Sequence, residues 1–165
     1  MFEQIKCCNN IFCVDIVETK SYYASYSEIC DCPKCRNYYQ LIKSYSTSLN
    51  DFLDQFGIDI EKPIEIVCFE ANKIDHTVEY IAYYSVNGSV DVGEGEIEID
   101  DVKVSVEKPE LSSNTEMTEL YFILEISKLH LPWCITDDID VVFPDIQERE
   151  NISYKIKSLL LRIFG

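Results

Sequence analysis

The chain has 165 residues, 47% of them hydrophobic, and carries 30 acidic against 14 basic side chains, for a formal net charge of −16. This length and composition predict a single globular domain, residues 1–165, with a sizeable core. Because no cluster of Lys and Arg offsets the negative charge, we expect no nucleic-acid partner and no membrane partner.

The N-terminus lacks the basic stretch and apolar run of a signal peptide, and the most apolar segment, around Leu159, is too short to cross a bilayer. These features predict a cytoplasmic protein. Since thiols stay reduced in the cytoplasm, the eight cysteines indicate buried thiols, a metal site or redox chemistry, and not a disulfide framework.

The N-terminal segment predicts short strands. Residues 2–8 and 11–17 form two of them, joined by Asn9-Asn10, a turn that tolerates positive φ. Residues 21–27 are expected to be another strand or an extended lead-in to the next element.

The periodicity then becomes helical, with two apolar stripes at i, i+3, i+4 and i+7: Tyr38, Leu41, Ile42 and Tyr45, followed by Leu49, Phe52, Leu53 and Phe56. Pro33 suits the first turn of the first helix. Ser48 and Asp51 have the spacing of a capping box, and Gly57 fits the left-handed position after the second helix. We therefore expect an inserted helical hairpin over about residues 33–57.

The chain from residue 63 to about residue 127 reads as strands, at 64–69, 77–86, 89–92, 96–99, 102–106 and 119–127. Asn87-Gly88 predicts a tight hairpin, and Asp100-Asp101 predicts a second turn. Leu120, Phe122, Leu124 and Ile126 alternate with polar residues and are expected to face inward. Such spacing is typical of an antiparallel β-sandwich of about seven to nine strands.

The C-terminus predicts an amphipathic helix, with an apolar stripe of Ile152, Ile156, Leu159, Leu160 and Ile163. This helix is expected to cover an open face or edge of the sheet, and a dimer contact is the alternative. The fold class is therefore α+β: an antiparallel β-sandwich with an inserted helical hairpin and a C-terminal helix.

The richest chemistry lies in Cys30-Asp31-Cys32-Pro33-Lys34-Cys35-Arg36-Asn37, at the start of the first helix of the expected hairpin. The sequence favours a structural interpretation of this segment. Cys35 would face the same core as Ile42, where a free thiol behaves as a small apolar group, and Cys32 would be the N-cap. Arg36 and Asn37 form a further candidate site, whose hydrogen bonds would brace the helices against the sheet.

Zinc is the second interpretation, with Cys30, Cys32 and Cys35 as ligands. A structural zinc site normally has four protein ligands. The fourth would come from elsewhere in the chain, from Cys13, Cys68, Cys134, His76 or His130.

Thiol redox chemistry is the third interpretation, because Cys32-Pro33-Lys34-Cys35 is a CxxC motif at a helix start and its proline is placed as in glutaredoxins. A helix N-terminus lowers the pKa of a thiol. A thioredoxin-like fold, however, needs a buried parallel strand before the motif, and residues 21–27 are too polar for one.

The chain also resembles a family of uncharacterised bacterial proteins with a Cys-x-Cys-Pro-x-Cys-Arg-Asn motif. The resemblance covers roughly residues 20–135 and rests on residues 30–37, Gly57-Ile58-Asp59 with Lys62-Pro63, Leu131-Pro132-Trp133, and Ala82-Tyr83-Tyr84-Ser85-Val86-Asn87-Gly88. Ser85 stands where the family has His, so no role for that imidazole carries over. The resemblance implies kinship without an activity.

Together these patterns predict a small cytoplasmic binding or interaction module without catalysis, whose partner is a protein or a small-molecule ligand. No cofactor is expected under the structural interpretation of the cysteines. The alternatives are a zinc-stabilised module that uses Cys30, Cys32 and Cys35, and a redox protein that uses Cys32 and Cys35.

Overall fold

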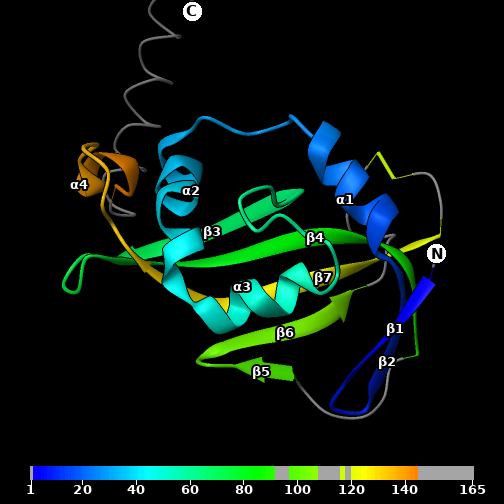
Figure 1. The fold of residues 1–165 in the computed structure, drawn as a ribbon. Helices are drawn as coiled ribbons and strands as arrows, with labels where there is room; N and C mark the ends of the chain where they lie inside the picture. The colour runs from blue at the N-terminus through cyan, green and yellow to red at the C-terminus, as the bar shows by residue number, and fades with distance from the viewer. Residues whose placement is uncertain (1, 92–96, 108–115, 118–119, 145–165) are drawn as a thin grey trace, which may run out of the picture.

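The computed structural model describes residues 2–91, 97–107, 116–117 and 120–144. These residues form an α+β fold of four helices and a sheet of seven strands, all paired antiparallel (Figure 1). The strands are β1 (Phe2–Cys7), β2 (Asn10–Asp15), β3 (Glu65–Asn72), β4 (Thr77–Asp91), β5 (Ile97–Ile99), β6 (Val102–Glu107) and β7 (Tyr121–Pro132). The helices are α1 (Ile16–Ser25), α2 (Pro33–Tyr45), α3 (Thr47–Asp54) and α4 (Ile139–Val142). The predicted C-terminal helix lies outside the described residues.

The strands run in the order β1-β2-β4-β7-β6-β5, and β3 pairs with β4 on the same edge as β2. The predicted sandwich of two stacked sheets is not confirmed, because the described strands connect into one sheet. Helices α1, α2 and α3 lie on one side of it (Figure 1). None of the helices in the described ranges has the length and apolar content that a membrane crossing requires.

Strand β4 pairs with β2, β3 and β7, and the hairpin predicted at Asn87-Gly88 is wrong. Asn87 pairs with Tyr121 of β7, and Gly88 pairs with Val14 of β2, so the strand continues through both residues and adds a partner there. Gly88 has φ +144°, and a Cβ on it would collide with the backbone oxygen of Cys13. The glycine therefore allows a close approach of two strands instead of a turn.

Residues 21–25, in the range predicted as a strand or an extended lead-in, belong to helix α1, and β2 ends at Asp15 instead of continuing to residue 17. Asp15 is the N-cap, and its Oδ1 accepts a hydrogen bond from the Glu18 N–H at 3.3 Å. This Asp-x-x-Glu spacing is a capping-box signature that competes with the β propensity of the following residues.

The same helix fills a gap along one edge of β4, between the part of the strand that pairs with β3 and the part that pairs with β2. The Tyr23 hydroxyl donates to the Ser85 carbonyl at 3.0 Å, and the Asn87 N–H donates to the Thr19 hydroxyl at 3.1 Å. Side-chain hydroxyls thus satisfy backbone groups that would otherwise need a neighbouring strand.

Helices α2 and α3 occupy the range predicted as a helical hairpin. Pro33 begins α2, as expected, while α3 is capped by Ser46, whose Oγ accepts from the Leu49 N–H at 3.0 Å, and not by Ser48. Gly57 has φ +80°, which confirms the left-handed position. The hairpin arrangement is not confirmed, because α3 turns away from α2 at their junction instead of running back alongside it (Figure 1).

The core lies between these helices and the sheet. Its largest fully buried side chains include Phe12, Tyr38, Ile42, Leu49, Leu53, Phe56, Tyr80, Tyr84, Leu124 and Ile126. Phe122, Leu124 and Ile126 are buried as predicted, whereas Leu120 precedes β7 and is 67% exposed. The hydroxyls of Tyr38 and Tyr84 are 2.6 Å apart, and Tyr84 donates to the Ile60 carbonyl, so the buried phenols keep hydrogen bonds.

Candidate functional site

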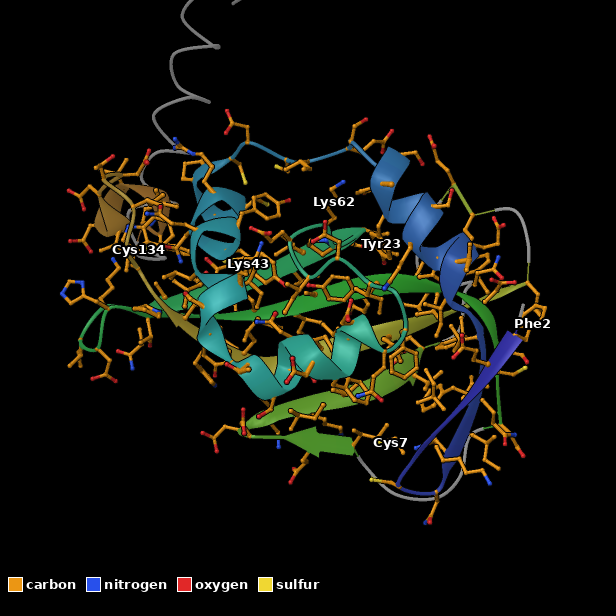
Figure 2. The ribbon with its side chains drawn as sticks, viewed as in Figure 1. Phe2, Cys7, Tyr23, Lys43, Lys62 and Cys134 are labelled. Atoms are coloured by element: carbon orange, nitrogen blue, oxygen red, sulfur yellow. The ribbon has the colours of Figure 1, made fainter. Side chains whose placement is uncertain are left out.

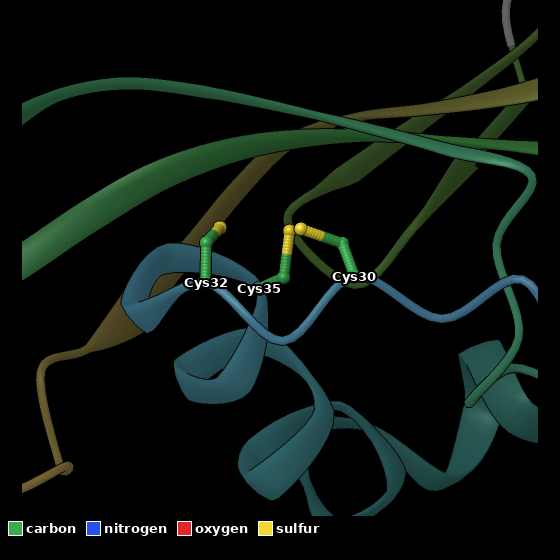
Figure 3. A group of neighbouring side chains, drawn as sticks. All are labelled: Cys30, Cys32 and Cys35. Atoms are coloured by element: carbon green, nitrogen blue, oxygen red, sulfur yellow. The ribbon is translucent and has the colours of Figure 1, made fainter.

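The three cysteines of the motif lie together at the start of α2. Cys30 and Cys32 belong to the extended segment that leads into the helix, and Cys35 lies in its first turn. The three side chains point to the same side, and the sulfur of Cys30 is turned toward that of Cys35 (Figure 3). All three sulfur atoms lie within 4.8 Å of one another, although the residues sit on two different local structures.

Burial differs among the three thiols, none of which is in a disulfide. Cys30 and Cys32 are exposed, and Cys35 is 9% exposed and counts among the buried apolar residues together with Ile42. Cys35 is therefore buried as the structural interpretation predicts, although the core cluster around Ile42 does not include it, and Cys32 is the N-cap residue. The structural interpretation does not explain why the sulfurs of the exposed Cys30 and Cys32 also lie close to that of Cys35.

The helix start separates the acidities of Cys32 and Cys35. Burial raises the pKa of Cys32, but the N–H of Cys35 and the neighbouring thiols outweigh it, and the net pKa is lowered from 9.0. Burial raises the pKa of Cys35 well above that value, and the thiols of Cys32 and Cys30 raise it further. Between Cys32 and Cys35, a negative charge is therefore more stable on Cys32, beside the N-terminus of α2.

The Asn37 side chain is fully buried and makes three hydrogen bonds. Its Nδ2 donates to the Tyr80 hydroxyl at 3.2 Å and to the Pro132 carbonyl at 3.1 Å, and its Oδ1 accepts from the Cys134 N–H at 2.8 Å. These bonds join α2 to β4 and to the end of β7, so the predicted bracing role of Asn37 is confirmed.

Arg36 also connects α2 to a distant segment. Its guanidinium donates to Asp137 at 2.9 Å and lies 3.9 Å from the Asp31 carboxylate. Arg36 and Asn37 are therefore both engaged within the fold, where they support the segment around the thiols.

None of the residues proposed as a fourth zinc ligand joins the cluster in the described part of the chain. For Cys68, burial raises the pKa of the thiol to about 11. Its sulfur contacts the Phe69 carbonyl instead, at 3.5 Å. The described residues therefore provide three thiols and no fourth protein ligand.

A cavity of about 360 Å³ adjoins two of the three thiols. Cys30 and Cys35 line it together with Glu28 and Glu65. The rest of its lining is aromatic or apolar: Tyr26, Tyr39, Pro63, Ile64 and Ile66. Sequence reasoning missed this cavity because Glu65 reaches it only when the chain at Ile64 pairs with Tyr83 of β4. Glu28, two residues before Cys30, was the available signal.

A larger cavity of about 500 Å³ lies between α1 and the chain around Lys43 and Lys62, which Figure 2 labels. Its lysines already have partners: Lys43 and Glu61 are 2.7 Å apart, Lys62 donates to the Tyr23 carbonyl, and Lys20 lies 3.8 Å from Asp54. It contains no thiol, so we assign the candidate chemistry to the smaller cavity.

Comparison with protein-family models, with curated proteins and with solved structures gives no match for this chain. The resemblance to a bacterial family therefore stays a prediction, and the candidate site rests on its own geometry.

Proposed function

We propose that the protein is a small binding module, without catalysis, in which Cys30, Cys32 and Cys35 hold a soft metal ion, with zinc as the expected ion. The observation that supports this proposal is the approach of all three sulfurs to within 4.8 Å of one another. Thiolates are the ligands that soft and borderline metal ions prefer in proteins.

The sulfur positions suit a single ion after a small adjustment. Zinc binds thiolate at about 2.3 Å with tetrahedral angles, so sulfurs on one ion are roughly 3.8 Å apart. Cys30 and Cys32 lie on an extended, exposed segment and can close this difference without moving the core. Cys35, fixed in the helix, would set the position of the ion.

The charge balance also favours metal binding. Three thiolates around a divalent ion carry a net charge of about −1, which the positive end of a helix dipole stabilises. The backbone N–H groups of Lys34 and Cys35 already stabilise the Cys32 thiolate. Metal binding removes the protons of all three thiols, so the lowered pKa of Cys32 favours binding, whereas the raised pKa of Cys35 opposes it and makes binding weaken as the pH falls.

The proposed site leaves one coordination position for a group from outside the described residues. Sites with three protein ligands bind water or a ligand in that position, unlike closed structural sites. This is why we propose a binding module instead of a purely structural zinc site. Since all eight thiols are free, we extend the proposal to a reducing compartment, the cytoplasm.

Redox chemistry is a second candidate, favoured by the opposite pKa shifts of Cys32 and Cys35. A lowered pKa suits an attacking thiol and a raised pKa suits a buried second thiol. In this reaction the two thiols would pass two electrons and two protons to an external disulfide, which becomes two thiols as Cys32 and Cys35 form a disulfide.

Metal analysis of protein purified under reducing conditions tests the proposal. We expect one zinc per chain, and we expect Cys30→Ser, Cys32→Ser and Cys35→Ser each to weaken zinc binding by about 100-fold or more, because each removes a ligand. The control is Cys8→Ser, which removes an exposed thiol in the turn between β1 and β2 and should leave zinc binding unchanged.

Two results would contradict the metal site. A reversible Cys32–Cys35 disulfide with a defined potential, in protein that binds no metal, would support the redox candidate. Neither metal binding nor a disulfide would support the structural interpretation. Loss of zinc in Cys68→Ser would show that Cys68 completes the site and that the fourth position is closed.

A further inference from the structure

We propose that the open position of the metal site faces the 360 Å³ cavity, and that the cavity takes a small aminothiol whose sulfur binds the metal and whose ammonium lies near Glu28 and Glu65. This inference rests on the proposed metal site and adds the class of ligand that the site would bind.

The geometry connects the thiol cluster to the cavity. Cys30 and Cys35 belong both to the group of three sulfurs and to the cavity lining, whereas Cys32 belongs to the group alone. An ion held by all three sulfurs is therefore next to the cavity, and its fourth position is accessible from there.

The size of the cavity limits what it can hold. Small-molecule sites in proteins range from about 300 to 1,000 Å³, so this cavity lies at the lower end. It therefore suits a compact ligand. Its lining combines two thiols, two tyrosines and two glutamates with Pro63, Ile64 and Ile66.

Charge selects a cation. The lining contains Glu28 and Glu65 and, among the described residues, no basic side chain. The basic residues of the motif are engaged elsewhere: the Lys34 ammonium lies 4.5 Å from the centre of the Phe143 ring, and Arg36 binds Asp137. Together with the net negative charge of a metal bound by three thiolates, this lining repels anions and attracts an ammonium group.

The two tyrosines support the same ligand. Tyr26 and Tyr39 line the cavity, and an aromatic ring attracts a cation placed over its face.

Binding needs no redox partner. The thiol of the ligand releases its proton to solvent, its sulfur replaces the group in the fourth position, and no carbon bond forms or breaks. A soft sulfur donor matches the metal preference of the site, whereas a plain amine offers only the cationic group.

The test uses full-length protein loaded with Co²⁺, whose visible absorption reports its thiolate ligands, titrated with cysteamine, 2-mercaptoethanol and mercaptoacetate. These probes carry a positive, a neutral and a negative group besides the thiol. Because the thiol groups of the three probes differ in acidity, the affinity of each probe is compared only between the wild type and the variants, and not with the affinity of another probe. We expect Glu28→Gln with Glu65→Gln to weaken cysteamine binding by about tenfold and to strengthen mercaptoacetate binding, with 2-mercaptoethanol unchanged.

Glu3→Gln, a charge change on the exposed face of β1, is the matched control and should alter no affinity. If the double variant does not fold, the single variants and the salt dependence of wild-type cysteamine binding replace it, since added salt should weaken the attraction.

The outcomes separate the two proposals. Protein that binds no cobalt contradicts the metal site itself. Protein that binds cobalt but no thiol, or binds all three probes equally in wild type and in the charge variants, overturns the ligand inference and leaves the metal site intact. Loss of cobalt in a glutamate variant would identify that carboxylate as a metal ligand and would also overturn the inference.

Discussion

The first turn of α2 presents two groups of polar side chains that the fold treats in opposite ways. Asn37 is fully buried, and its amide makes three hydrogen bonds to β4, β7 and the chain after β7. The second group consists of the thiols of Cys30, Cys32 and Cys35, of which two are exposed and whose sulfur atoms lie close together. The comparison teaches that a polar cluster already used by the fold has no capacity for a ligand, whereas the thiol cluster keeps that capacity.

The largest expected effect comes from removing the group that the fold uses. Asn37→Ala should lower the free energy of unfolding by about 3 kcal/mol, because it leaves the Pro132 carbonyl and the Cys134 N–H without their buried partner. Urea unfolding measures this change. The neighbouring Arg36→Gln is the control, since an exposed ion pair contributes about 0–1 kcal/mol. Equal losses of unfolding free energy in Asn37→Ala and Arg36→Gln would contradict the view that the buried amide contributes more to the fold than the exposed ion pair.

Cys35 should give the next largest effect, because it belongs to both the core and the cluster. In metal-free protein, Cys35→Ala is expected to lower the free energy of unfolding by about 1 kcal/mol, the loss of one sulfur's contacts. Zinc should stabilise the wild type and not this variant, since only the wild type retains the proposed site. The same unfolding curves with and without zinc measure both effects.

Cys30→Ser and Cys32→Ser should change the stability of metal-free protein by no more than about 0.5 kcal/mol, because exposed thiols contribute little packing. A loss as large as that of Asn37→Ala, in protein shown to be free of metal, would mean that these thiols are also used by the fold.

The smallest effect is a difference in reactivity. The pKa of Cys32 is lowered from 9.0, so Cys32 should become a thiolate at lower pH than an ordinary thiol does. Iodoacetamide should then label Cys32 in the metal-free protein with a midpoint below pH 9.0, while Cys35 remains unlabelled because burial raises its pKa. Mass spectrometry of peptides from a pH series measures both sites, and identical midpoints would contradict the separation.

Local patterns allowed much of the fold to be predicted. The turn between β1 and β2 falls on Cys8-Asn9, one residue before the predicted Asn9-Asn10, and Cys8 takes the positive φ, +53°. Asp100 takes φ +54° in the predicted turn between β5 and β6. Pro33 begins α2 with Cys32 as its N-cap. Each of these features depends on a few adjacent residues, which is why sequence alone was sufficient.

The errors arose where a distant partner decides the local structure. Asn87-Gly88 has a hairpin signature, but the approach of Cys13 makes it a point of close contact within one strand. Residues 21–27 resemble a strand, yet the Asp15 cap and the burial of Tyr23 against β4 favour a helix. The candidate site was partly predictable for the same reason: the thiols are adjacent in sequence, whereas Glu65 arrives from β3.

The way α1 fills the edge of β4 has a consequence for amide hydrogen exchange. The Asn87 N–H is held by the Thr19 hydroxyl and not by a carbonyl of a neighbouring strand. When α1 lifts from the sheet, this proton exchanges with solvent even though β4 stays paired with β7. The exchange rate of one amide in the centre of the sheet therefore reports the opening of a helix, independently of the strands around it.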